Sequence, residues 1–227
     1  MIPWLALVLA VIAAVALIYW LLVTTEGVFL GRRVVVWLYD VTATRYDAIK
    51  QYNPVEEQVL VVRPIIQALG ARRQPRLLDV ATGTGRVPLA MVEALDEGTV
   101  VGLDDSARML AIAAEKLAAH DERVTLVRHP AVPLPFAANS FDVVTCLEAL
   151  EFFPSDEAAL REMVRVLRPG GALITTRRSG WEGRLFLTRY RSEPALRALL
   201  GALGLDDVRT YLWEVNYDLV TARKPLG

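Results

Sequence analysis

The sequence predicts an α/β protein with a mostly parallel sheet, preceded by one membrane-spanning helix. Short apolar runs alternate with helical patterns between residues 77 and 203, the order that right-handed crossovers between parallel strands produce. A Gly-Thr-Gly turn follows the first of these runs, and residues 2–23 contain no charged side chain. The chain of 227 residues has room for one sizeable domain and one added element.

The N-terminal segment, residues 1–24, is expected to be a transmembrane helix. Its apolar run is long enough to span a bilayer, and Trp4, Tyr19 and Trp20 near its ends fit interfacial aromatic belts. A cleaved signal peptide or a buried core helix are the alternatives, and the lack of a basic start disfavours the signal peptide. Arg32 and Arg33 follow the span and nothing basic precedes it, which places the rest of this single-pass chain in the cytoplasm.

Residues 25–44 contain apolar stretches on both sides of this arginine pair, each too short to span a membrane. We expect this juxtamembrane segment to lie at the membrane interface, with packing on the domain as the alternative. The folded domain then covers residues 45–227. The segment from Tyr39 to Ala71, which crosses this boundary, reads as helix, with Pro54 suited to the first turn of a new helix. Tyrosines such as Tyr46 either line a substrate entrance or pack under a lid helix.

The remaining elements follow in a regular order. Helices are expected from Val87 to Leu95, after the capping residues Ser106 and Ser155, and from Glu193 to Leu203. The turn Pro169-Gly170-Gly171 should end the third of these helices. Strands are expected at Leu77–Ala81, Val100–Leu103, Val124–Val127, Phe141–Leu147 and Ala172–Thr176, followed by a hairpin of Val208–Val215 and Tyr217–Ala222.

The glycine turn indicates a ligand site. Gly83 and Gly85 let a ligand approach the backbone beside the positive end of the following helix. About twenty residues further on, Asp104 ends the second apolar run, where an acid can accept hydrogen bonds from a ribose. Together the turn and the acid predict a site for a nucleoside-containing cofactor.

Composition excludes several other classes of site. The net charge of -1 gives no electrostatic footprint for nucleic acid, so we expect no nucleic-acid partner. A single cysteine, Cys146, rules out a disulfide framework or a thiolate metal cluster within the chain. His120 and His129 are too few and too isolated for a histidine-based metal site, so we expect no metal.

Four blocks in order resemble a known family: Leu78–Gly85, Val101–Leu110, Leu134–Phe136 with Ser140–Val144, and Leu160–Gly171. From about Tyr39 to Pro225 the chain resembles the class I S-adenosylmethionine-dependent methyltransferases, in the group that includes quinone-ring C-methyltransferases. The resemblance implies a Rossmann-like, seven-stranded sheet with helices on both faces and an antiparallel last strand. It also implies S-adenosyl-L-methionine as the cofactor.

The resemblance assigns the cofactor site residue by residue. Asp79 is similar to the acid near the methionine end of the cofactor, and Asp104 would hold the ribose hydroxyls, with Asp105 as the alternative. The cofactor-binding positions expected in this way are Asp79, Ala81, Thr82, Gly83, Gly85, Asp104, Asp105, Ala131 and Leu147. Because the methyl sulfonium is already activated, the protein must mainly position the acceptor.

Three positions depart from the family pattern. Ala81 replaces the first glycine of the loop, a variant familiar in the quinone methyltransferase group. Pro130 replaces the acid that contacts adenine, so adenine recognition would depend on backbone groups near Ala131, on Leu103 and on Phe136. Phe152 replaces a histidine found in many relatives, which puts histidine-based catalysis at this position in doubt.

The acceptor side is less clearly marked. Glu148 and Glu151 follow the fourth strand and are candidate proton acceptors, with a helix cap or a solvated helix face as the alternative. Tyr46 and Tyr190 are candidate substrate residues. Tyr190 lies in the short connection after the fifth strand, where this fold often builds its acceptor pocket.

These observations predict a membrane-anchored methyltransferase acting on a small, lipophilic acceptor such as a quinone precursor or a lipid. The first alternative is a catalytically silent cofactor-binding scaffold of a membrane complex. A nicotinamide-dependent oxidoreductase is disfavoured, because Pro88 stands where a third glycine would belong. The sequence does not indicate which atom of the acceptor is methylated or what the oligomeric state is.

Overall fold

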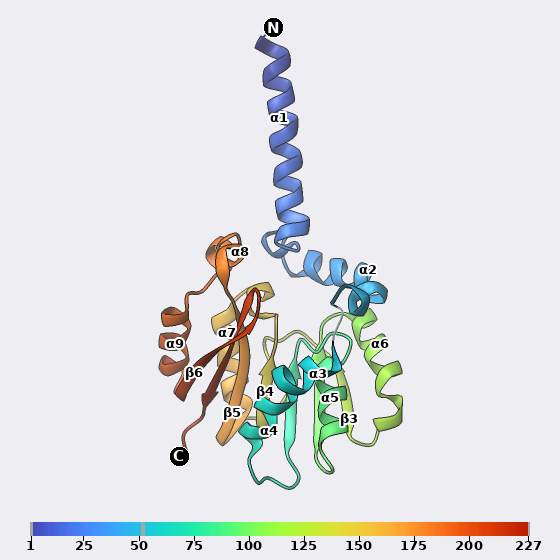
Figure 1. Ribbon diagram of the computed structural model, residues 1–227, viewed down its shortest axis with the longest axis vertical. Coiled ribbons are helices and arrows are strands. Elements are labelled where there is room, and N and C mark those ends of the chain that lie inside the picture. Colours follow the sequence, from blue (N-terminus) through green and yellow to red (C-terminus); the bar gives the residue numbers. More distant parts are fainter. Residues whose placement is uncertain (1, 51–52, 227) are drawn as a thin grey trace.

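A sheet of seven strands forms the centre of the folded domain, in a computed structural model that describes residues 2–50 and 53–226 (Figure 1). The strand order is β3-β2-β1-β4-β5-β7-β6. Among the described strands, β7 alone runs against the others. The predicted mostly parallel sheet with an antiparallel last strand is therefore confirmed. The strands are β1 (Arg76–Val80), β2 (Thr99–Asp104), β3 (Val124–Arg128), β4 (Phe141–Cys146), β5 (Leu167–Arg178), β6 (Asp206–Glu214) and β7 (Tyr217–Arg223).

Helices cover both faces of the sheet, because successive side chains of a strand point to opposite faces. On β1, Leu77 packs with α4 (Arg63–Leu69), α5 (Arg86–Ala94) and α6 (Ala107–Leu117). Its neighbour Leu78 packs with α7 (Asp156–Val166) and α9 (Glu193–Ala202) on the other face. All residues of β4 are buried, which explains why this strand reads as a continuous apolar run.

The turn Pro169-Gly170-Gly171 lies inside a strand. Helix α7 ends at Val166 and β5 begins at Leu167, earlier than the expected start at Ala172. Pairing with β4 shifts register between Phe141 and Val143, as at a β-bulge. A Cβ on Gly171 would come within 2.9 Å of the Asp142 carbonyl oxygen, so this glycine lets the two strands approach.

The segment before the sheet is helical, as expected between Tyr39 and Ala71, and a new helix begins at Pro54. Helix α2 (Arg32–Lys50) begins seven residues earlier than Tyr39 and runs across the expected domain boundary at residue 44. After residues 51 and 52, which lie outside the described residues, come α3 (Pro54–Glu57), the π-helical η3 (Gln58–Val62) and α4.

Helix α2 has two different faces. Val35 and Ala43 are buried against the domain, where α2 packs on α6, whereas Trp37 and Val41 are exposed. The segment at residues 25–44 thus packs on the domain through one face and leaves an apolar face uncovered. Short helical turns complete the chain: η2 (Val28–Leu30), η4 (Ala118–His120), η5 (Leu150–Phe152), α8 (Gly180–Arg184) and η6 (Leu187–Arg189).

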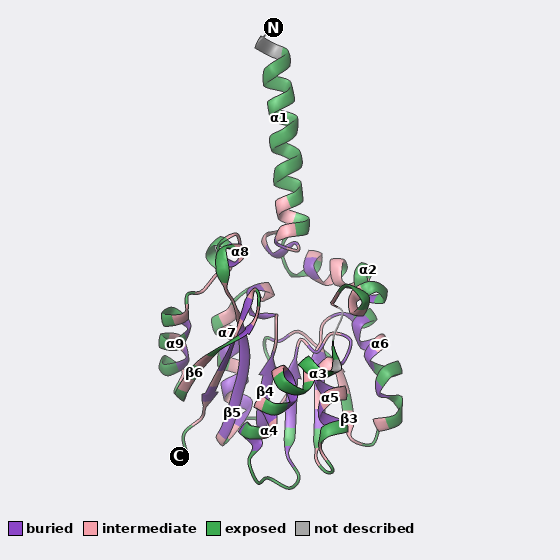
Figure 2. Ribbon diagram, viewed as in Figure 1, coloured by how far each residue is buried: buried purple, intermediate pink, exposed green. Residues whose placement is uncertain are grey.

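Helix α1 (Ile2–Tyr19) stands clear of the domain (Figure 1) and its apolar surface is exposed (Figure 2). It continues as the π-helical η1 (Trp20–Thr24). By length and composition, Trp4–Thr24 could cross a membrane, with a mean hydropathy of 2.9. At its lower end, the Trp20 indole stacks on Phe29 at 5.0 Å and donates a hydrogen bond to the carbonyl of Leu185 at 3.3 Å. The base of this helix is therefore attached to the domain.

Candidate functional site

A cavity of about 430 Å³ lies at the carboxyl ends of the central strands, under helix α2. Ligands of doubly wound sheets bind at this edge, where the strand order reverses, here between β1 and β4. Its floor comes from the turn after β1 and from the end of β2, and its far wall from the segment after β4. The expected site residues that line it are Tyr46, Ala81, Gly83, Asp104, Asp105, Ala131, Leu147 and Glu148.

The turn after β1 is built from left-handed residues. Ala81, Gly83 and Gly85 have φ values of 61°, 54° and 83°. A Cβ added to Gly83 would meet no protein atom within 4 Å, so the space beside it is open to a ligand. A Cβ on Gly85 would lie 3.1 Å from Ala113, so this glycine lets α6 pack closely. The two glycines thus serve different purposes.

Asp104 is held in place by the backbone around it. Its Oδ2 accepts a hydrogen bond from the Gly83 N–H and its Oδ1 accepts one from the Ser106 N–H, each at 2.8 Å. Burial raises the pKa of this carboxyl. A carboxylate has about four lone-pair sites, so these bonds do not use all of its capacity to accept hydrogen bonds from ribose hydroxyls. Asp105 also lines the cavity, but Arg32 forms an ion pair with it.

Asp79 lies below the turn and outside the cavity lining. It is buried and accepts a hydrogen bond from the Thr145 hydroxyl at 2.6 Å. Burial raises its pKa to about 6. Among the described residues, Thr82 and Gly85 also lie outside the lining; the Thr82 N–H donates to the Leu103 carbonyl at 3.0 Å and so joins the turn to β2.

The end expected to receive adenine is apolar. Leu103, Pro130 and Ala131 line it, together with His129, whose Nδ1 lies 2.8 Å from the Pro130 carbonyl oxygen. Phe136, which we expected here, packs edge-on against Phe141 at 5.1 Å, outside the lining of the cavity.

The opposite end of the cavity has aromatic walls. Phe152 lies between Tyr39, at 5.9 Å, and Phe186, at 6.0 Å, with edge-to-face geometry in both pairs. Tyr39 is 6.0 Å from Tyr46, and both tyrosines line the cavity. The residue that replaces the family's histidine is therefore part of an apolar wall.

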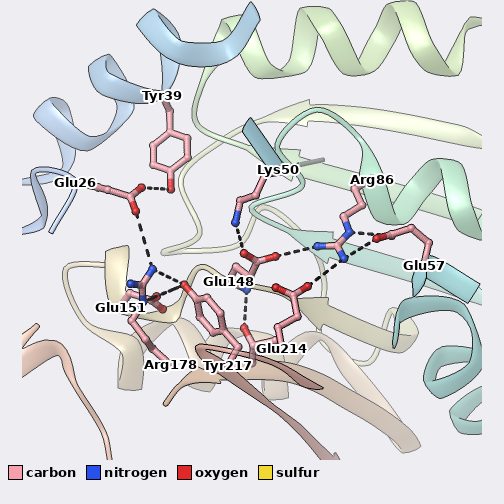
Figure 3. A network of polar contacts seen from close by, with 11 residues as sticks. Glu26, Tyr39, Lys50, Glu57, Arg86, Glu148, Glu151, Arg178, Glu214 and Tyr217 are labelled. Carbon is pink, nitrogen blue, oxygen red and sulfur yellow. Dashed lines mark hydrogen bonds and ion pairs between the residues drawn. The ribbon is translucent and has the colours of Figure 1, made fainter. Parts of the chain in front are cut away.

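Glu148 faces the cavity, and its carboxylate is already in ion pairs with two cations (Figure 3). Its carboxylate forms an ion pair with Lys50 and another with Arg86, whose Nη1 lies 2.9 Å from Oε1. Arg86 also binds Glu57 at 2.7 Å and reaches Glu214 at 3.5 Å. Glu148 therefore belongs to an ion-pair network that joins four elements of the domain.

Glu151 lies in a second group of polar contacts, outside the cavity lining (Figure 3). Its buried carboxylate accepts hydrogen bonds from Arg178 at 2.8 Å and from the Tyr217 hydroxyl at 2.6 Å. Arg178 also lies 4.0 Å from Glu26, which accepts a hydrogen bond from the Tyr39 hydroxyl at 2.8 Å. Burial raises the pKa values of Glu26 and Tyr39.

The two tyrosines expected to contact substrate are separated. Tyr46 lines the cavity, whereas Tyr190 packs near Gly183 and lies 3.4 Å from Arg177, outside the cavity lining. The connection after β5 folds into α8 and η6 and turns this side chain away.

Two acids on α2 were not expected to contribute to the site. Asp40 accepts hydrogen bonds from the Ser106 hydroxyl at 2.5 Å and the Arg108 N–H at 3.3 Å. Asp47 accepts one from the Thr84 hydroxyl at 2.7 Å. Their spacing of two helical turns places them on one face, a signal present in the sequence, but the helix that this face contacts could not be read from it.

Comparison with known proteins agrees with this geometry. A family model described as a methyltransferase domain matches residues 78–175. The matched residues run from β1 into β5 and include Gly83 and Asp104, so this end of the cavity lies within the region that is similar to a methyltransferase domain. The described residues contain no group of three or more His, Cys, Asp or Glu side chains that could hold a metal ion.

A curated relative is similar in sequence over part of the chain. Over 131 residues the chain is 37% identical to a demethylmenaquinone methyltransferase of Staphylococcus aureus (strain JH9), covering 57% of this chain and 54% of that protein. The chain thus spans about half the length of the relatives that it matches.

Solved structures share the fold. A SAM-dependent methyltransferase from Aquifex aeolicus superposes with a TM-score of 0.62 at 19% identity, covering 81% of this chain and 97% of that one. The phosphoethanolamine N-methyltransferase 2 of Haemonchus contortus, in complex with S-adenosyl-L-methionine, gives 0.69 at 16% identity, covering 82% and 57%.

Proposed function

We propose that the protein transfers a methyl group from S-adenosylmethionine to a small, lipophilic acceptor, a quinone precursor or a lipid, at a membrane surface. The observation that carries this proposal is the shape of the cavity. One end holds the open glycine turn at Gly83 and the fixed carboxylate of Asp104, and the other end is walled by Tyr39 and Phe152.

The residues at the first end suit the cofactor. Asp104 keeps acceptor capacity for ribose hydroxyls, and Gly83 leaves its backbone open to a ligand. Leu103 and Ala131 offer apolar surface and backbone groups for adenine. When bound, the cofactor supplies a methyl group on a positively charged sulfur.

The aromatic end suits the acceptor. Phe152 and Tyr39 exclude water and orient a flat or apolar molecule, which is the contribution that methyl transfer most needs from the protein. The Tyr39 hydroxyl donates its proton to Glu26, so its oxygen can accept a hydrogen bond from an acceptor hydroxyl. In this arrangement the proton of an acceptor hydroxyl passes to the Tyr39 oxygen while the Tyr39 proton passes to the Glu26 carboxylate, and Glu148 takes no part.

The N-terminal segment explains where such an acceptor would be met. Helix α1 anchors the chain in the bilayer, and the exposed Trp37 and Val41 of α2 lie at the interface above the cavity. Arg32 and Arg33 follow the span, which orients the domain to the cytoplasm. The name of the Staphylococcus aureus relative supports a demethylated quinone as the first acceptor to test.

The test is methyl transfer by the full chain in lipid nanodiscs. The purified protein receives methyl-labelled S-adenosylmethionine with either demethylmenaquinone or phosphatidylethanolamine, and the label in the organic extract is counted. We expect label in one of these lipids, loss of transfer in Asp104→Asn, and normal transfer in Asp207→Asn, which changes an exposed acid far from the cavity. Cofactor binding without transfer to either lipid, or to a total lipid extract, would instead support the silent scaffold.

A further inference from the structure

The connection between β5 and α9, residues 179–192, carries bulky apolar side chains into solvent. Trp181 is 71% exposed and Leu187 is 59% exposed. The same segment buries Phe186 and Gly183, so it is fixed on the domain while these two side chains project from it. Several exposed apolar side chains that gather on one surface mark an interaction site, whereas single ones do not.

The hairpin turn between β6 and β7 extends this surface. Asn216 donates a side-chain hydrogen bond to Glu182 at 2.8 Å, and its carbonyl accepts one from the Ser179 N–H at 2.7 Å. The adjacent Val215 is 95% exposed. We call Trp181, Leu187 and Val215 the insert patch.

Helix α8, which carries Trp181, lies at the level where the N-terminal helix meets the domain. Figure 1 shows α8 beside the lower end of α1, and the Trp20 indole donates its hydrogen bond to Leu185 between α8 and η6. The attachment fixes the height of the connection relative to the apolar helix. A bilayer that surrounds the end of α1 would therefore also reach α8 and its Trp181.

Composition favours a lipid surface over a protein surface. Trp is enriched at the level of lipid headgroups, where its ring meets both apolar and polar surroundings. The exposed Arg184 lies between Trp181 and Leu187 in the sequence, and a cation at this depth suits anionic headgroups.

The same connection also supports the wall of the cavity. Phe186 packs edge-on against Phe152, and the Arg189 guanidinium donates a hydrogen bond to the Phe153 carbonyl at 2.7 Å. Phe152 and Phe153 both line the cavity. Leu187 of the insert patch is thus the chain neighbour of Phe186, which packs on the cavity wall at Phe152.

We propose that the insert patch is a second membrane contact, separate from α1 and α2, that inserts Trp181, Leu187 and Val215 among the headgroups of an anionic bilayer. The contact fixes the aromatic wall of the cavity against the lipid surface from which the acceptor comes. The inference depends on the proposed membrane anchoring by α1.

The test measures lipid contact at single positions of the full chain. The only cysteine, Cys146, is buried, so the unmodified chain is the labelling blank. Three variants, Trp181→Cys, Leu226→Cys and Val11→Cys, receive an environment-sensitive fluorophore. They are reconstituted in vesicles of phosphatidylcholine and phosphatidylglycerol, with and without lipids that carry a quencher near the headgroup or in the acyl chain. Leu226 is the matched control, an exposed leucine at the opposite end of the domain.

We expect the headgroup quencher to reduce the signal at position 181 severalfold more than at position 226, and the acyl-chain quencher to act at position 11. Quenching at 11 but not at 181 would overturn the second contact and leave the anchor in place. No quenching at 11 would overturn the anchor and this inference with it. Equal quenching at 181 and 226 would show unspecific adsorption, and a blue shift at 181 without quenching would show a protein partner; both overturn the inference.

Discussion

Asp40 accepts a hydrogen bond from the Ser106 hydroxyl at 2.5 Å, which ties the helix nearest to the apolar N-terminus to the cofactor end of the cavity. Ser106 caps α6, because its hydroxyl oxygen accepts a hydrogen bond from the Met109 N–H. The Ser106 N–H donates a hydrogen bond to Asp104. One serine thus connects α2, the helix cap and the acid proposed to hold the ribose. Helix α2 is a fixed roof over this end of the cavity.

We therefore expect Asp40→Ala to weaken cofactor binding although Asp40 is not proposed to contact the cofactor. Losing a hydrogen bond of this kind costs about 1 kcal/mol, or roughly fivefold in Kd. Calorimetric titration with S-adenosylhomocysteine measures the change. The control is Thr42→Ala on the same helix, whose hydroxyl bonds the carbonyls of α2 itself. Equal Kd values for the two variants would contradict the claim that Asp40 holds α2 over the cofactor end of the cavity.

Glu148→Gln should leave most of the turnover intact, because the carboxylate is held in ion pairs with Lys50 and Arg86. A general base contributes about 10²–10⁴-fold to the rate, so we expect a loss well below that range. Glu57→Gln is the matched control, since it removes another carboxylate from the same Arg86. A collapse of kcat in Glu148→Gln alone, with a changed pH profile, would identify Glu148 as the base.

Phe152→Leu should raise the KM for the lipophilic acceptor and leave the Kd for the cofactor unchanged. The substitution removes two edge-to-face contacts, with Tyr39 and Phe186, and an aromatic surface for the acceptor. Such contacts contribute about 1 kcal/mol, which corresponds to roughly a fivefold change in KM. The control Phe136→Leu alters an aromatic pair outside the cavity lining and should affect neither constant. An unchanged KM in Phe152→Leu would remove this residue from the acceptor site.

The buried carboxyl of Asp79 gives a pH dependence of stability. Its pKa is raised from 3.8 to about 6 in the folded protein, so the folded state binds more protons than the unfolded state between these values. The free energy of unfolding contributed by this group therefore falls as the pH rises through this range, by about 3 kcal/mol in total.

Asp79→Asn removes this dependence and keeps an acceptor for the Thr145 hydroxyl. The melting temperatures of the two proteins, compared at pH 4.5 and pH 7.5, should show the Asn variant gaining relative to the wild type at the higher pH. A difference that is independent of pH, or that reverses, would show that burial does not raise the pKa of Asp79 in the folded protein.

Sequence reasoning was sufficient for the features that depend on neighbouring residues. Strands β1, β2 and β4 were predicted because buried parallel strands read as apolar runs. Gly83 and Asp104 were assigned from the turn and the strand that carry them, and the structure places both at one cavity.

Features that depend on distant partners could not be predicted in this way. Glu148 meets Arg86 across 62 positions and Lys50 across 98, so nothing near Glu148 in the sequence showed that its carboxylate would be neutralised. Tyr190 was expected at the acceptor, but the path of its connection is set by packing against Gly183. The inner face of α2 was ambiguous, because its other face is apolar as well.

The most direct test of the central claim is calorimetric titration of the detergent-solubilised full chain with S-adenosylmethionine, S-adenosylhomocysteine and NADH. We predict that the first two bind and that NADH does not. Asp104→Ala, folded by circular dichroism, should weaken binding by about tenfold or more, because hydrogen bonds to a charged group are lost. Asp207→Ala should bind as the wild type does. A folded protein that binds neither S-adenosylmethionine nor S-adenosylhomocysteine would contradict the proposed cofactor site and the methyltransferase activity with it.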